Sequence, residues 1–159
     1  MRKRTAMVAF VAVVLLLGVV LAACGESGPA SAGGTLKAGL AFTTTGPSAA
    51  LGDNVANGTR LAIKVVNDRG GLKIGGKSYK IESAEYSTDG KPDVGVSVSK
   101  KLIEQDQVQI IFGDCISTVA LAQQPVIEKA AVPWITMASH ADLTKDRKWT
   151  FRSNNIMTA

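Results

Sequence analysis

The sequence contains few of the residues that support metal, redox or covalent chemistry. Its 159 residues include 2 cysteines and 1 histidine, and aromatic residues make up 5% of the chain. A metal site needs a cluster of His, Cys or carboxylate ligands, so we predict no metal site and no cofactor. The composition, with 46% hydrophobic and 19% charged residues, suits a globular protein and excludes a wholly disordered or fibrous one.

Acidic residues are absent before Glu26, whereas Arg2, Lys3 and Arg4 place three positive charges at the start of the chain. The formal net charge is +5, and leaving out these three charges with residues 1–23 reduces it to +2. The excess of positive charge therefore lies mainly in this first segment. Composition gives little support for a nucleic-acid partner, and we predict none.

The first segment has the pattern of an export signal. An uncharged run from Thr5 to Ala23 follows the basic residues and ends in Leu21-Ala22-Ala23-Cys24. This pattern predicts a signal peptide over residues 1–23. The last four residues also resemble the lipobox of bacterial lipoproteins, which implies that the Cys24 sulfur carries diacylglycerol and anchors the chain outside the cytoplasm, on the cell membrane. The alternative is an uncleaved membrane span, because the apolar run approaches the minimum length of one.

Residues 24–34 are rich in Gly, Ser and Ala and carry one charge. Such a composition predicts a flexible tether, so we expect the folded domain to occupy residues 35–159. If Cys24 is acylated, Cys115 has no cysteine left to pair with. We therefore expect Cys115 to be a free thiol.

The remaining sequence alternates between the period of a strand and the period of a helix. Asp53 or Asn54 can cap the first helix, Gly70 and Gly71 can end it, and Pro92 suits the first turn of the second. The run 108–112, apolar except for Gln109, predicts a strand buried on both faces. Together these patterns predict an α/β fold with a parallel sheet and helices on both faces. The expected strands are 36–42, 79–86, 108–112, 132–135 and 149–152, and a third helix is expected at 117–129.

Two motifs suggest enzymes and lack the context that enzymes need. Residues 71–78 match the P-loop pattern, but a helix precedes them and a strand follows, which favours a β-turn over a phosphate-binding loop. Ser117, His140 and Asp142 supply the residue types of a hydrolase triad, without the glycine-flanked turn that exposes a nucleophilic serine. We predict no catalytic residues, and an envelope serine hydrolase remains the alternative from another class.

Polar residues follow two strands that are expected to be neighbours in the sheet. Ser117 and Thr118 open a helix directly after the strand 108–112, and Ser139 follows the strand 132–135. A helix start offers unpaired N–H groups that, with short hydroxyls, suit a carboxylate ligand. The alternative is that Ser117 serves only as the N-cap of its helix.

The order of several short motifs resembles the branched-chain amino acid type of periplasmic solute-binding protein, the receptor of bacterial ABC importers. The motifs run from residue 46 to residue 152: Gly46-Pro47-Ser48-Ala49-Ala50-Leu51-Gly52, Gly58 to Ala62, Val66-Asn67-Asp68-Arg69-Gly70-Gly71, Ile110-Ile111-Phe112-Gly113, Ser117, Pro125-Val126, Val132-Pro133 and Phe151-Arg152. The resemblance implies the type I periplasmic-binding fold, in which two lobes close over a small ligand. It also implies ABC permease subunits as partners.

The resemblance further implies that Ser117, Ser139 and the backbone near Met137 bind the carboxylate and amino groups of an amino acid. Leu51 stands where this family often has an aromatic residue over the ligand, so the ligand is expected to differ in shape. The cysteine that forms a disulfide near the cleft in some members is absent here. The chain ends within the first lobe of the family, so we expect weak binding or none. A sensor built on the same fold is the second functional alternative.

Overall fold

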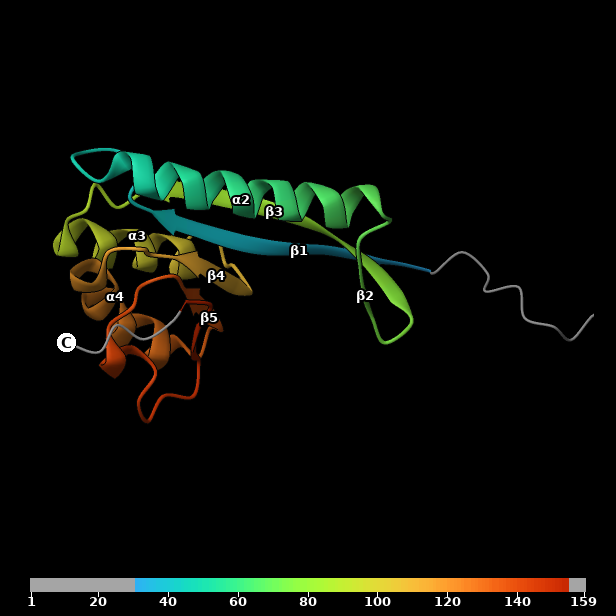
Figure 1. The fold of residues 1–159 in the computed structure, drawn as a ribbon. Coiled ribbons are helices and arrows are strands. Elements are labelled where there is room, and N and C mark those ends of the chain that lie inside the picture. Colours follow the sequence, from blue (N-terminus) through green and yellow to red (C-terminus); the bar gives the residue numbers. More distant parts are fainter. Residues whose placement is uncertain (1–30, 155–159) are drawn as a thin grey trace, which may run out of the picture. The chain divides into compact units, whose positions relative to one another are not determined.

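The computed structural model describes residues 31–154, which form one six-stranded sheet with helices on both faces (Figure 1). The predicted signal peptide, Cys24 and the tether up to residue 30 lie outside the described residues. The strands are β1 (Ser31–Phe42), β2 (Leu72–Ile74), β3 (Lys77–Ser87), β4 (Ile110–Gly113), β5 (Trp134–Thr136) and β6 (Thr150–Arg152). The helices are α2 (Ala49–Asp68), α3 (Pro92–Glu104), α4 (Ser117–Ala130) and the short 3₁₀ helix η1 (Ala141–Leu143).

The strand order is β2-β3-β1-β4-β5-β6, and every pair is parallel except β2 with β3. The predicted parallel α/β sheet is therefore confirmed, with one antiparallel strand at its edge. Gly75 and Gly76, with φ of +56° and +77°, form the turn between β2 and β3. The P-loop-like segment is thus part of a β-hairpin, because no helix follows its second glycine.

β1 begins at Ser31, earlier than the start near Thr35 that composition suggested. Its first residues pair with the start of β3, where Ser31 lies opposite Lys77 and Ala32 opposite Ser78. The register shifts between Ala32 and Gly34, and the small residues of this part show no alternation of apolar side chains that would predict a strand. Backbone pairing with β3 thus orders a segment whose composition alone is typical of a tether.

Two apolar clusters lie on opposite faces of the sheet. Residues of α3 and α4, including Leu102 and Ile127, pack with Ile111 and Trp134 on one face. On the other face α2 contributes Ala56, which packs with Leu40 and Phe42 of β1. Figure 1 shows α2 alone on its side of β1 and β3, and α3 and α4 on the other side. None of the helices between residues 31 and 154 combines the length and apolar character needed to cross a lipid bilayer.

The start of α2 differs from the prediction. The helix begins at Ala49 with Ser48 in the N-cap position, and neither Asp53 nor Asn54 caps it. The reason is tertiary packing: a Cβ atom on Gly52 would lie 1.7 Å from the Thr43 carbonyl oxygen, so this first turn rests directly on the end of β1. The predicted stop is confirmed, since Gly70 and Gly71 follow α2 with φ of +98° and +92°.

The prediction that β4 is buried on both faces is wrong. Ile111 is fully buried, whereas its neighbours Ile110 and Phe112, which point to the opposite face, are only half-buried. The largely apolar run therefore predicted a strand correctly, but it led to an overestimate of how deeply one face of the strand is buried. The carboxyl ends of β1, β3, β4 and β5 lie along one edge of the sheet, which is where open α/β sheets bind ligands.

Candidate functional site

The loops that follow β4 and β5 contact each other directly. The backbone carbonyl of Asp114, just after β4, accepts hydrogen bonds from the Thr136 hydroxyl at 2.9 Å and from the Met137 N–H at 3.2 Å. The two strand ends that the sequence placed side by side are therefore joined by one backbone and one side-chain hydrogen bond.

The Asp114 side chain ties three strand ends together. It is fully buried and accepts hydrogen bonds from the hydroxyls of Thr43, after β1, and Thr88, after β3. It also accepts the N–H groups of Cys115 and Ile116. No pattern in the sequence assigned this role to Asp114. The available signal was an acidic residue placed directly between a buried strand and a helix start.

The start of α4 keeps hydrogen-bonding capacity unused. Its N-cap is Ile116, which has no side-chain cap, so the interpretation of Ser117 as the N-cap is wrong. Asp114 takes the N–H groups of residues 115 and 116, and the Ala120 N–H donates to the Ile116 carbonyl at 2.9 Å. The N–H groups of residues 117–119 make no hydrogen bond within residues 31–154. Three amides thus remain at the positive end of a 14-residue helix.

The side chains of Ser117 and Thr118 lie on this first turn of α4. Ser117 is half-buried, Thr118 is exposed, and neither hydroxyl has a partner in the part of the chain that the structure describes. Both hydroxyls can therefore donate to an anion at the helix start, as the sequence suggested. The free amides and these two hydroxyls form the first half of the candidate site.

The loop after β5 supplies the second half, and Arg152 of β6 holds it. The Arg152 guanidinium donates to the carbonyls of Ser139 at 3.0 Å and His140 at 2.8 Å, and to the Thr144 hydroxyl at 2.5 Å. The Ser139 side chain is half-buried, and its hydroxyl has no partner among the described residues. Arg152 thereby fixes the position of Ser139, a role that the sequence did not indicate.

The backbone near Met137 makes hydrogen bonds within the fold. The Met137 N–H is bonded to Asp114, its carbonyl accepts the Asn154 side-chain amide at 3.1 Å, and the next N–H, of Ala138, donates to the Thr136 hydroxyl. The N–H groups of Met137 and Ala138 are already used by the fold, which leaves the hydroxyl and the N–H of Ser139, neither of which has a partner among residues 31–154, as donors of this loop. Leu51 lies on the first turn of α2 with 52% of its surface exposed, and it offers aliphatic contact only.

Cys115 forms no disulfide within the described residues and is half-buried beside Asp114. Burial, helped by the charge of Asp114 and a hydrogen bond to it, raises the pKa of Cys115 to about 12. A thiol with such a high pKa is a poor nucleophile. His140 and Asp142 contact each other on an exposed loop, and Ser117 makes no hydrogen bond to His140, so the contact that a hydrolase triad needs is absent between them.

The fold and this edge define a class of protein: an α/β lobe that presents polar loops and a helix start at the carboxyl ends of parallel strands, where small molecules bind. The family profile of the periplasmic binding proteins matches residues 35–158. The chain belongs to this family, and residues 31–154 form part of a periplasmic-binding-protein lobe.

Individual relatives agree with the family. A Leu/Ile/Val-binding protein homolog 7 from Brucella abortus is 31% identical over 122 residues, which are 77% of this chain and 29% of the relative. The branched-chain amino acid transporter substrate-binding protein LivJ of Streptococcus pneumoniae, solved with isoleucine, has a TM-score of 0.71 and 29% identity over 77% of this chain and 34% of that one. A solute-binding protein of Rhodopseudomonas palustris, solved with 3,4-dihydroxybenzoic acid, has a TM-score of 0.64 and 32% identity over 76% of this chain and 32% of that one. The chain therefore spans about a third of the length of the proteins it resembles.

Proposed function

We propose that the chain is the first part of an extracytoplasmic solute-binding receptor of an ABC importer, and that its ligand is a small carboxylate such as a branched-chain amino acid. The observation that carries the proposal is the start of α4. Three backbone N–H groups that have no partner within residues 31–154 and the hydroxyls of Ser117 and Thr118 meet there, next to the loop that holds Ser139. This set of donors suits a carboxylate group, which accepts several hydrogen bonds at once.

The ligands of the related structures support a carboxylate more strongly than a particular side chain. Isoleucine and 3,4-dihydroxybenzoic acid differ in shape and polarity, yet both contain a carboxylate. In this proposal α4 and Ser117 bind the shared carboxylate. Ser139 contacts the ligand group next to the carboxylate. Leu51 and the other residues of the loop after β5 contact the rest of the ligand.

The proposed receptor also includes a lipid anchor, a linking segment, a second lobe and a permease partner. Cys24 carries the lipid that anchors the receptor to the membrane, and the stretch before β1 links the anchor to the lobe. A second lobe, supplied by the longer protein, closes over the ligand. The ligand binds the closed form better than the open form and so raises its population, and ABC permease subunits recognise the closed form.

The proposal is tested by nuclear magnetic resonance titration of the chain with isoleucine and with 4-hydroxybenzoate at millimolar concentrations. We expect the amide signals of residues 117–119 to shift with either carboxylate and to shift little with isoleucinamide, which lacks the anion. Ser117→Ala should weaken the effect several-fold, whereas Ser97→Ala, on the exposed side of α3, should leave it unchanged. If the amides of residues 117–119 remain unmoved by both carboxylates, the proposed site is wrong.

A further inference from the structure

The hairpin formed by β2 and β3 carries positive charge that the fold does not use. Residues 69–80 contain no acidic residue and four cationic ones: Arg69, Lys73, Lys77 and Lys80. The Lys80 ammonium donates to a backbone carbonyl at the end of α2. The side chains of the other three cations make no hydrogen bond or ion pair within residues 31–154. Of the flanking acidic residues, Asp68 is paired with Lys64, and Glu82 lies beyond Lys80, further from the turn.

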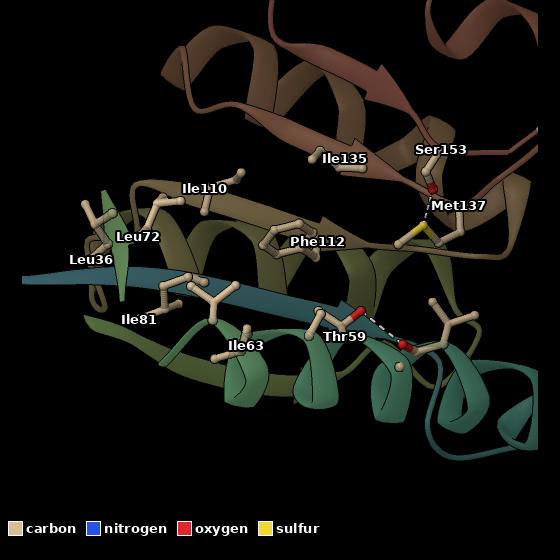
Figure 2. Close-up of a pocket in the computed structure, with 15 residues that line it drawn as sticks. Leu36, Thr59, Ile63, Leu72, Ile81, Ile110, Phe112, Ile135, Met137 and Ser153 are labelled. Atoms are coloured by element: carbon tan, nitrogen blue, oxygen red, sulfur yellow. Dashed lines mark hydrogen bonds between the residues drawn. The ribbon is translucent and has the colours of Figure 1, made fainter. Parts of the chain in front are cut away.

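Two apolar side chains of β2 are exposed beside these charges. Leu72 and Ile74 are 41% and 49% exposed, and both point to the same face because side chains alternate along a strand. Figure 2 shows Leu72 next to Leu36 at one end of an apolar groove beside α2. Ile74 does not line this groove and is paired with Lys77 across the hairpin. Ile74 is thus an exposed apolar side chain with a lysine as its cross-strand neighbour.

The hairpin lies at the end of the sheet where the chain enters it (Figure 1). Ile74 of β2, Lys77 of β3 and Ser31 of β1 are paired in one row. Neighbouring strands are about 4.8 Å apart, so Ile74 lies about 10 Å from Ser31. Cys24, the proposed site of the lipid, precedes Ser31 by seven residues, which span at most about 25 Å. A chain anchored at Cys24 therefore keeps the hairpin within reach of the membrane surface.

The edge of β2 is poorly suited to pairing with another strand. β2 has 3 residues with Lys73 at its centre, and the Gly75-Gly76 turn follows it directly. Short edge strands that carry lysine are a device by which proteins avoid edge-to-edge association. An apolar tip flanked by lysines has instead the composition of a lipid-interface contact. Ile74 can enter the boundary of the headgroups while the lysine ammonium groups remain among the phosphates.

We propose that the β2–β3 hairpin docks on an anionic phospholipid surface, with Ile74 at the headgroup boundary and Lys73 and Lys77 on lipid phosphates at either side of it. The inference rests on the membrane anchor of the proposed function, since the anchor holds the hairpin at a high effective concentration near lipid. Each Lys or Arg close to an anionic membrane strengthens binding about fivefold. The anchor keeps the lobe at the membrane, and the hairpin gives it an orientation.

This orientation directs the candidate site toward solution. β3 runs from Lys77 at the hairpin to Ser87, and its 11 residues span about 35 Å. Thr88 follows at the far end and donates to the buried Asp114 beneath the start of α4. The hairpin and the candidate site therefore lie at opposite ends of the sheet. A lobe that rests on the hairpin leaves the carboxyl ends of its strands open to solutes.

The test places a fluorophore on the hairpin and measures its distance from lipid. The 159-residue chain is purified in detergent and reconstituted into vesicles that contain a lipid with a nitroxide quencher on its headgroup. The vesicles are made of phosphatidylcholine alone or with about a third phosphatidylglycerol, which is anionic. The fluorophore is attached to Ser78→Cys on the hairpin or, as the control, to Ser97→Cys on the exposed side of α3. The parent, labelled in the same way, gives the background from Cys24 and Cys115.

We expect the nitroxide to quench the label at position 78 about fivefold more strongly or more in the anionic vesicles, and to quench position 97 equally in both. Salt at about 1 M, which shortens the Debye length to about 3 Å, should remove the difference. Lys73→Gln with Lys77→Gln should also remove most of it. Lys145→Gln with Lys148→Gln makes the same change of charge on an exposed loop and should leave the difference intact.

Ile74→Ser tests the apolar part of the contact and should lower the quenching at position 78 about threefold, although both lysines are kept. Equal quenching of position 78 in the two kinds of vesicle, or of positions 78 and 97 in the anionic vesicles, overturns the proposal. So does a signal at position 78 that depends on the ratio of protein to lipid, which identifies a second copy as the occupant.

Vesicle sedimentation separates this inference from the proposed function. A chain that sediments with both kinds of vesicle and shows no difference at position 78 contradicts the hairpin contact alone. A chain that stays in solution with both contradicts the anchor and the hairpin contact together. The candidate carboxylate site is not involved in either measurement, since no ligand is added.

Discussion

The Thr43 hydroxyl lies 3.1 Å from the Asp114 Oδ2 atom, across 71 positions of sequence and in the fully buried interior. With Thr88 on the other side, this contact gives a buried carboxylate only neutral partners: hydroxyls, backbone N–H groups and the Cys115 thiol. The ends of β1, β3 and β4 are thereby fixed beneath the start of α4. The geometry of the candidate site thus depends on a residue that does not need to touch the ligand.

Asp114→Asn should destabilise the chain by about 2–3 kcal/mol, although the two side chains have nearly the same shape. The amide NH₂ group would replace one acceptor oxygen with a donor and would face groups that themselves donate, so at least one buried group loses its partner. Urea denaturation followed by circular dichroism measures the change. Asp146→Asn, on an exposed loop, should stay within about 0.5 kcal/mol of the parent, and an equal loss for both variants would contradict the role given to Asp114.

Arg152→Lys should loosen the loop after β5. The guanidinium serves two carbonyls and one hydroxyl at once, and a lysine ammonium on a flexible stem cannot reproduce this planar fork. We expect a loss of about 1–2 kcal/mol and faster amide hydrogen exchange in the loop that contains Ser139. Arg147→Lys, which is exposed, serves as the control. Unchanged exchange in the loop would show that Arg152 does not hold it.

Alanine substitutions at two helical glycines should change the free energy of unfolding in opposite directions. A Cβ atom on Gly95 of α3 would lie 2.6 Å from the Val119 Cγ1 atom, and Val119 is fully buried in α4. Gly95→Ala should therefore cost about 1–3 kcal/mol through overpacking. Gly58 of α2 has open space around its Cβ position, so Gly58→Ala should stabilise the chain by about 0.5–1 kcal/mol. Thermal unfolding of both variants checks the pair, and the same sign in both would refute it.

Glu128 of α4 should make stability depend on pH. Partial burial acts to raise the pKa of Glu128, but hydrogen bonds from Thr150, Trp149 and Lys148 outweigh it and hold the pKa below its ordinary value. A group with a depressed folded pKa contributes stability above its unfolded pKa, about 4.3, and this contribution disappears as the pH falls through the folded pKa.

The parent should therefore exceed Glu128→Gln in unfolding free energy by about 1 kcal/mol at neutral pH, a value reduced by the exposure of these bonds. The two chains should converge in acid. Urea titrations at a series of pH values measure the difference. Glu82→Gln, an exposed change on β3, should show no such convergence, and a constant gap between the parent and Glu128→Gln at all pH values would rule out this origin.

The fold was predictable where local patterns agree with tertiary packing. The alternation of periods identified the strands and helices, and Gly70 and Gly71 ended α2 as expected because a left-handed stop is a local property. The start of α2 was not predictable, since it depends on the contact of Gly52 with the end of β1. The burial of β4 was overestimated for a similar reason. An apolar run indicates that its side chains are suited to burial, but it does not show whether a helix packs on them.

The candidate site was predictable in its position and less so in its details. Parallel topology alone brings the helix start at Ser117 next to the loop of Ser139, because the carboxyl ends of neighbouring strands share an edge. The roles of Asp114 and Arg152 were not predictable, since no local pattern links Asp114 to Thr43, 71 positions away, or Arg152 to Ser139, 13 positions away. The same holds for the Met137 backbone, whose hydrogen bonds are internal.

The two tryptophans of the chain lie in opposite surroundings, which provides a built-in optical signal of folding. Trp134 is fully buried beneath α4, whereas Trp149, on the loop before β6, is 36% exposed. Emission from Trp134 should lie at shorter wavelength and resist quenching by iodide, and emission from Trp149 should be quenched. Replacing Trp149 by phenylalanine would leave a single emitter whose shift to longer wavelength follows the separation of β5 from α4.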